Sequence, residues 1–168
     1  MQLSISKPAG TRDLPHLALC TPQGLAILKA IDHPLESPLS APVTIATLEA
    51  FTDAWNRHDV DGLLSFMHPD GVFMTAGGPQ ACGSRHQGHE ALRKAFPGAW
   101  ATVPDAQWIN GKHFVQGDFG VSEWTYVGTS TDGSRIETDG VDIFAFKDGK
   151  ILSKSAFRKN RPNLPAAK

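Results

Sequence analysis

Apolar residues recur at three- and four-residue steps over residues 43–57, which is the period of a helix with one buried face. This face consists of Ile45, Leu48, Phe51 and Trp55. A second helix is expected directly afterwards, because Asp59 can cap its first turn and Pro69-Asp70-Gly71 can end it. A third helix is expected from His89, and Pro97-Gly98 should break it.

The rest of the chain alternates between apolar and polar positions, which is typical of strands. A short strand is expected over residues 72–76, followed by a glycine-rich loop over residues 77–88. Four longer strands follow, over residues 106–115, 121–128, 135–146 and 151–158. Their turn signals are Gly117-Asp118, Asp132-Gly133 and Asp148-Gly149, so we expect hairpins. Helices followed by an antiparallel meander predict an α+β fold.

Residues 1–42 differ from the remainder, because six prolines are scattered through weakly periodic sequence. Only residues 24–31 look able to form a short helix. We therefore divide the chain into a proline-rich extension (residues 1–42), a folded domain (residues 43–162) and a C-terminal tail (residues 163–168).

Charge and cysteine content narrow the possible partners and compartments. The 16 basic and 17 acidic residues give a formal net charge of −1, and the longest basic stretch is "FRKNR", so no nucleic-acid partner is expected. Two cysteines are too few for a disulfide framework, and the first residues lack the apolar core of a signal peptide. No apolar run approaches the ~20 residues of a membrane span. We expect a soluble, cytoplasmic protein.

Asp142 is an acid in the apolar centre of a predicted strand, where it shares one face with Phe144 and Phe146. A two-residue turn at Asp132-Gly133 would set Glu123 opposite Asp142 on that face. Two buried carboxylates at this distance repel, so one of them would hold a proton more tightly. The same register places on this face Val121, Thr125 and Val127.

Three stretches, at residues 51–76, 88–96 and 140–151, together resemble a known protein family in their order and spacing. Together they resemble the SnoaL-like branch of the nuclear transport factor two superfamily, which also holds ketosteroid isomerases and limonene epoxide hydrolases. The resemblance covers about residues 43–160. It implies a cone-shaped, cystatin-like fold in which a curved sheet wraps the helices around one deep pocket, usually in a dimer. It implies no single reaction, because this fold hosts enzymes and non-enzymatic binding modules.

The resemblance also bears on individual residues. It places Asp142 at the position of a ketosteroid isomerase acid that an apolar site keeps neutral. The tyrosine donor of that family is Phe51 here, and its proton-moving aspartate falls at about Thr75, so steroid isomerisation by that mechanism is not expected. Related domains place functional side chains at the positions of Lys154 and Ala156.

The final hairpin admits two registers. A three-residue loop with a bulge at Gly149 sets Lys154 opposite Asp142, whereas a two-residue loop sets Ser155 there. We favour the bulge. The candidate catalytic residues are then Asp142 as acid, base or oxyanion donor, Glu123 as its partner and Lys154 as a stabiliser of negative charge. A buried structural ion pair is the alternative interpretation of Asp142 and Lys154.

The expected ligand is a small apolar or amphipathic molecule. The remaining pocket residues are Phe51, Trp55, Phe73, Thr75, Val121, Thr125, Val127, Phe144 and Ala156. Two histidines, His86 and His89, lack a third ligand for a metal, and we expect neither a metal nor another cofactor. The function expected is an isomerase, cyclase or dehydratase that uses acid–base chemistry, and the alternative is a non-catalytic binding or dimerisation module.

The other face of the predicted sheet is apolar as well. The register assigns to it Trp124, Tyr126, Val141 and Ile143. A monomer rarely exposes such a surface, so we expect a homodimer that packs sheet against sheet. The alternative is that the helix of the extension covers this face.

Overall fold

The computed structural model describes residues 41–166. The helices are α1 (Ile45–Asn56), α2 (Val60–Phe66) and α3 (His89–Ala95), which follows the first two strands and continues into a short 3₁₀ helix (Phe96–Ala99). Thr44 caps α1, and Asp59 caps α2 by accepting a hydrogen bond from the Gly62 backbone N–H at 2.8 Å. All three predicted helices are confirmed. The helix expected over residues 24–31 lies outside the described residues.

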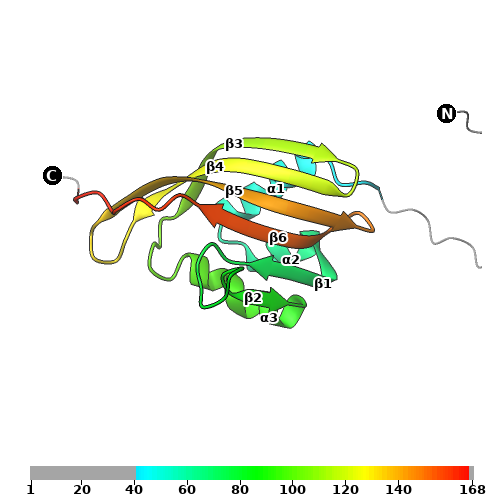
Figure 1. Cartoon of the computed structure of the whole chain (residues 1–168), viewed down its shortest axis with the longest axis horizontal. Helices are drawn as coiled ribbons and strands as arrows, with labels where there is room; N and C mark the ends of the chain where they lie inside the picture. Colours follow the sequence, from blue (N-terminus) through cyan, green and yellow to red (C-terminus); the bar gives the residue numbers. More distant parts are fainter. Residues whose placement is uncertain (1–40, 167–168) are drawn as a thin grey trace, which may run out of the picture. The chain divides into compact units, whose positions relative to one another are not determined.

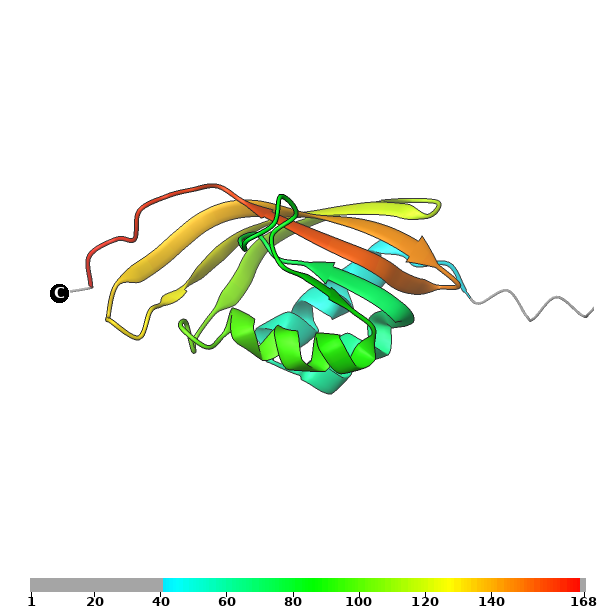
Figure 2. The ribbon, with the colours of Figure 1, turned by 60° about the horizontal axis from the view of Figure 1, so that its bottom comes forward.

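Six strands form one curved sheet in the order β2-β1-β6-β5-β4-β3. Their bounds are β1 (Met67–Met74), β2 (Arg85–Gln87), β3 (Gln107–Gln116), β4 (Phe119–Thr129), β5 (Arg135–Lys147) and β6 (Lys150–Arg158). Strands β3 to β6 form the expected antiparallel meander, and β1 joins it by pairing in parallel with β6 (Figure 1). The helices lie on one side of the sheet (Figure 2). The α+β prediction is therefore confirmed. β2 falls where a loop was expected, and Pro69-Asp70-Gly71, which was expected to end α2, lies within β1 because α2 already ends at Phe66.

The hairpin between β4 and β5 differs from its predicted register by one residue. Ser130 donates its backbone N–H to the Ser134 carbonyl at 2.8 Å, so the loop has three residues rather than two. A tight type I′ turn needs a positive φ at both central residues, but of the two only Gly133 has one, at 84°. Asp132 instead accepts a hydrogen bond from the Ser134 N–H at 2.9 Å, which favours the wider loop.

The hairpin between β5 and β6 departs from prediction in the opposite sense. Asp148 and Gly149 both have positive φ, at 50° and 68°, and they form the two-residue turn that we did not favour. The extra residue lies further along, where the pairing shifts between Ala145↔Ser153 and Phe146↔Ile151 and leaves Leu152 as a bulge. Asp142 therefore pairs with Ala156, while Lys154 pairs with Phe144.

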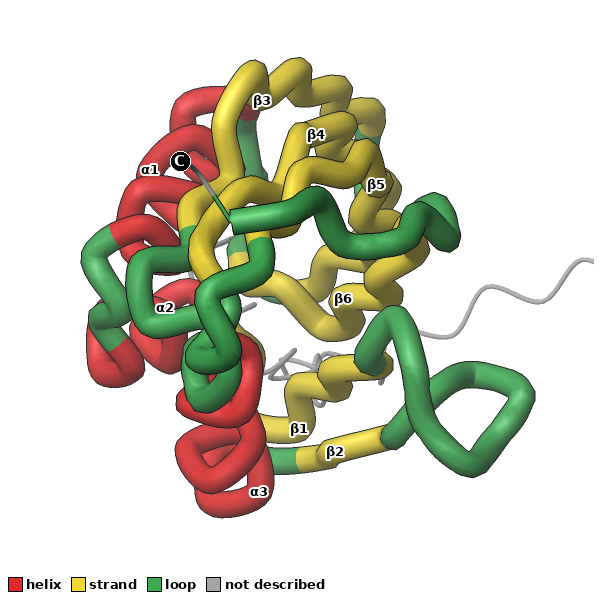
Figure 3. Tube along the Cα trace, turned by 90° about the vertical axis from the view of Figure 1, so that its left-hand side faces the viewer, coloured by secondary structure: helices red, strands yellow, loops and turns green. Residues whose placement is uncertain are grey.

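These registers sort the strand residues between the two faces of the sheet. The face that packs on the helices, here called the inner face, carries Ser122, Trp124, Tyr126, Asp142, Phe144 and Lys154, all buried. Figure 3 shows the sheet curving beside the three helices. After β6 the chain returns to the sheet, because Leu164 and Arg135 exchange two backbone hydrogen bonds. No helix within residues 41–166 has the length and apolar character needed to cross a membrane.

Candidate functional site

A cavity of about 530 Å³ opens on the inner face of the sheet. Its walls come from α1, from β1, β2, β3, β4 and β6, from the loop after β1, and from the end of α3 with the 3₁₀ helix. Most of the wall is aromatic or small, and the polar groups are few. The lining residues are Trp55, Phe73, Thr75, Ala76, Gly77, Ser84, His86, Lys94, Ala95, Gly98, Ala99, Trp108, Trp124, Tyr126, Lys154, Ala156 and Arg158.

Asp142 and Lys154 form a buried ion pair at this cavity. Lys154 Nζ lies 2.7 Å from Asp142 Oδ1, and both side chains are less than a tenth exposed. The indole N–H of Trp124 donates to the other carboxylate oxygen at 2.9 Å. Both oxygens of Asp142 thus accept hydrogen bonds. Lys154 and Trp124 line the cavity while Asp142 does not, so the carboxylate supports the wall from behind.

Aromatic rings surround the Lys154 ammonium on its cavity side. Its Nζ lies 5.2 Å from the ring centroid of Trp55 and 4.9 Å from that of Phe73. Ring faces are electron-rich and attract a cation, most strongly where water is excluded. The carboxylate and these two rings hold the ammonium in place at the wall of the cavity, where Lys154 is a lining residue.

His86 reaches the cavity from the edge strand β2, which sequence reasoning missed. Phe73 on β1 pairs with His86 on one side and with Lys154 on the other, so the three residues form one row across three strands. Neighbouring strands are about 4.8 Å apart, which puts the Cα atoms of His86 and Lys154 roughly 10 Å from each other. The only sequence signal was the short "RHQ" segment between glycines. An imidazole and an ammonium therefore flank one aromatic ring in one cavity.

Tyr126 and Arg158 form another part of the wall. The guanidinium carbon of Arg158 lies 5.3 Å from the ring centroid of Tyr126, and the Tyr126 hydroxyl donates to the Ala99 carbonyl at 3.3 Å. Burial raises the pKa of Tyr126 above its ordinary value, while the positive charge of Arg158 opposes this rise. At neutral pH the phenol is a neutral donor.

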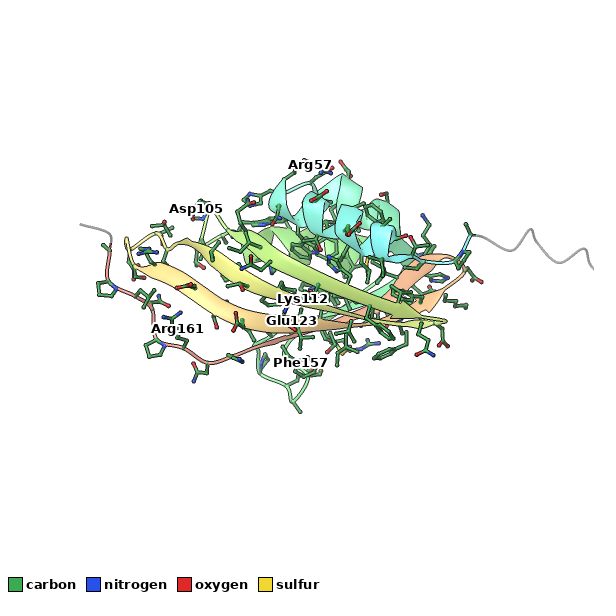
Figure 4. The ribbon with its side chains drawn as sticks, turned by 90° about the horizontal axis from the view of Figure 1, so that it is seen from above. Arg57, Asp105, Lys112, Glu123, Phe157 and Arg161 are labelled. Atoms are coloured by element: carbon green, nitrogen blue, oxygen red, sulfur yellow. The ribbon has the colours of Figure 1, made fainter. Side chains whose placement is uncertain are left out.

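Glu123 is not part of this site, contrary to prediction. It pairs with Val141 and lies on the outer face, where its carboxylate is 3.2 Å from Lys112 Nζ (Figure 4). The one-residue shift of the hairpin is the cause, because it moves every side chain of β4 to the other face. The same correction applies to Val121, Thr125 and Val127, which lie on the outer face.

Trp124 and Tyr126 move in the reverse direction: we placed them on the outer face, but they are buried and line the cavity. Of the predicted pocket residues, Trp55, Phe73, Thr75 and Ala156 do line it. Phe51 and Phe144 belong to the core beneath, where their ring centroids are 6.1 Å apart. Within residues 41–166 no three side chains of His, Cys, Asp or Glu are grouped as a metal site requires.

Comparison with known proteins gives a family match. Residues 48–154 match the family model described as the SnoaL-like domain. A comparison with curated proteins found no match.

Solved structures share the fold. A candidate polyketide cyclase from Xanthomonas campestris pv. campestris is 20% identical, with a TM-score of 0.59 over 67% of this chain and 87% of that one. A protein with a ketosteroid isomerase-like fold from Catenulispora acidiphila, solved with trimethylamine, is 17% identical, with a TM-score of 0.60 over 68% and 86%. TerC, co-crystallised with polyporic acid, is 22% identical, with a TM-score of 0.59 over 68% and 90%. The TM-scores establish a common architecture, and the chemistry must come from the residues of this chain.

Proposed function

This chain belongs to the SnoaL-like domain family, and we propose that it binds a small aromatic carbonyl compound in its cavity and shifts a proton on it, as an isomerase or cyclase. The observation that carries the proposal is the row His86–Phe73–Lys154 across β2, β1 and β6. It places a group that can accept a proton and a group that can stabilise a negative charge on either side of Phe73, along one wall of the cavity.

The roles follow from the ordinary chemistry of these side chains. His86 takes a proton from the carbon next to the carbonyl, and the C–H electrons form a new C=C bond while the C=O electrons move to oxygen. Lys154 donates a hydrogen bond to that oxygen as its charge develops. Returning the proton at another carbon completes an isomerisation. Alternatively, the enolate carbon attacks a second carbonyl of the ligand and closes a ring, and the alkoxide formed from that carbonyl takes the proton back from His86. Asp142 is a positioning residue that holds Lys154 at 2.7 Å and balances its charge.

The aromatic walls of the cavity can bind a flat ligand and exclude water from it. Trp55, Trp108 and Trp124 present large rings that can stack on a flat ligand and exclude water. Water exclusion strengthens the interaction between Lys154 and the developing oxyanion. Similarity in fold to a candidate polyketide cyclase and to TerC with polyporic acid supports a ligand of this kind.

Hydrogen–deuterium exchange of 2-tetralone in D₂O tests the proposal, because this bicyclic ketone exchanges its α-protons only through an enol or enolate. We expect the protein to accelerate exchange, measured by NMR, above an equal concentration of free imidazole. His86→Gln should lower the rate by about 10²–10⁴-fold and Lys154→Met by about 10²–10³-fold.

His68→Gln is the matched control, because His68 lies on β1 but does not line the cavity, and its rate should stay at the wild-type value. Exchange at the imidazole rate, or His86→Gln at the wild-type rate, would contradict the catalytic proposal. Tight binding of 2-tetralone without exchange would instead support a binding module.

A further inference from the structure

The charged residues of the cavity wall are all basic. Lys94, Lys154 and Arg158 line it, and no aspartate or glutamate does. The whole chain has a net charge of −1, so this bias is local. Lys154 is buried, whereas Lys94 and Arg158 are lining residues exposed to solvent, and a cluster of positive charge of this kind favours a ligand of opposite sign.

The three cations differ in whether a carboxylate already balances them. Lys154 is paired with Asp142 at 2.7 Å, and Lys94 is paired with Glu90 at 2.7 Å on the helix surface. Arg158 has no carboxylate partner among residues 41–166. Its guanidinium lies against the ring of Tyr126, which fixes one of its faces and leaves its edges free to donate. Arg158 therefore carries the uncompensated positive charge of the wall.

Arg158 lies on the same strand, β6, and on the same face of the sheet as Lys154, the proposed oxyanion donor. Lys154, Ala156 and Arg158 alternate on the inner face, so the Cα atoms of Lys154 and Arg158 are roughly 13 Å apart along the strand. Ala156 lies between them and has only a methyl group, which leaves this stretch of wall open. A flat ligand along β6 can place its carbonyl at Lys154 and another group at Arg158.

We infer that the ligand is an aromatic carboxylate whose acid group binds Arg158 at the end of β6 while its ring system lies along the tryptophan wall. Arginine fits this task because its planar fork donates two parallel hydrogen bonds to a carboxylate. The inference rests on the proposed function and specifies its substrate class. It assigns Arg158 to substrate recognition rather than to proton transfer.

Calorimetric titration of the full chain with 2-naphthoate and with 2-naphthamide tests the inference, because the two probes have the same ring system and differ in charge. We expect 2-naphthoate to bind at least tenfold more tightly. Arg158→Gln should weaken 2-naphthoate by roughly ten- to a hundredfold and leave 2-naphthamide unchanged. Arg158→Lys keeps the charge but loses the fork, so its affinity should fall between those of wild type and Arg158→Gln.

Arg161→Gln is the control, because Arg161 donates to Glu137 and does not line the cavity. It should bind both probes as wild type does, and thermal unfolding should show that all variants fold. Equal affinity for the two probes, or an Arg158→Gln variant that keeps its preference for 2-naphthoate, would overturn the inference and leave the proposed function standing. Failure of both probes to bind would overturn the inference together with the ligand cavity.

Discussion

Lys154 and Asp142 carry opposite charges in a site that excludes water, so each side chain depends on the other for its stability. Removing one partner of a buried pair leaves an uncompensated charge, which costs about 3–5 kcal/mol. We therefore expect Lys154→Met to lower the free energy of unfolding, measured in urea, by about this amount. Lys154→Met combined with Asp142→Leu removes both charges and should be less destabilised than the single variant. A double variant whose loss equals the sum of two single losses would contradict this coupling.

His113 is the residue whose titration the structure predicts most directly. Its Nδ1 lies 2.7 Å from Ser122 Oγ, and burial lowers its pKa below 6.5, while the carboxylates of Glu49 and Asp142 oppose that change. Because the folded state disfavours the protonated ring, this group lowers stability as the pH falls below about 6.5 and has no effect at higher pH. NMR titration should give a pKa below 6.5 in wild type and a still lower one in Asp142→Asn, which lacks one opposing charge. An unchanged pKa in that variant would show that Asp142 does not act on His113.

At the scale of elements, the Trp124 side chain on β4 lies against Gly140 on β5, and its indole N–H donates to Asp142 on the same strand as Gly140. Trp124 pairs with Gly140, and a Cβ added at Gly140 would overlap both the far end of the indole ring and the backbone carbonyl oxygen of Phe157. Gly140→Ala should therefore push the ring away from Asp142 and cost about 1–3 kcal/mol in unfolding free energy. Gly98→Ala is the matched control, because no atom lies near an added Cβ there, and it should stay within about 0.5 kcal/mol of wild type. Equal stability of the two variants would show that the indole has room to move.

The two Asp-Gly turns show how far sequence could predict this site. Period and turn residues located every helix and five of the six strands, because those patterns depend on local chemistry. The same dipeptide makes a three-residue loop at Asp132-Gly133 and a two-residue turn at Asp148-Gly149, and this choice depends on the Ser134 hydrogen bond to Asp132. A shift of one residue exchanges the two faces of a strand. Sequence therefore brought Asp142 and Lys154 together, but it gave Asp142 the wrong acidic partner and assigned Trp124 to the wrong face.

At the scale of the whole molecule, the outer face of the sheet carries an apolar patch beside polar rows that include Lys112, Glu123 and Asp139. Phe114, Val121 and Ile143 form one row across β3, β4 and β5, and Phe157 lies in the neighbouring row beside Val141. The side of the sheet away from α1, where Phe157 is labelled, is seen in Figure 4. Phe114 and Phe157 are more than half exposed, which is unusual for large apolar residues in neighbouring rows. The corrected register removes Trp124 and Tyr126 from this face and adds Glu123 and Thr125, so the apolar part of the surface is narrower than predicted.

We therefore expect a homodimer in which two outer faces pack around a two-fold axis, and a stable contact of this kind buries roughly 1,200–2,000 Å². Ile143→Glu places a charge in the centre of the surface and should give monomers in light scattering. Ile45→Glu is the matched control, because Ile45 is also exposed but lies on α1, and it should remain dimeric. A chain that starts at Val43 should remain dimeric too. A monomeric full-length protein that dimerises only after this truncation would show instead that the extension covers the face, because a covered face cannot pair until the cover is removed.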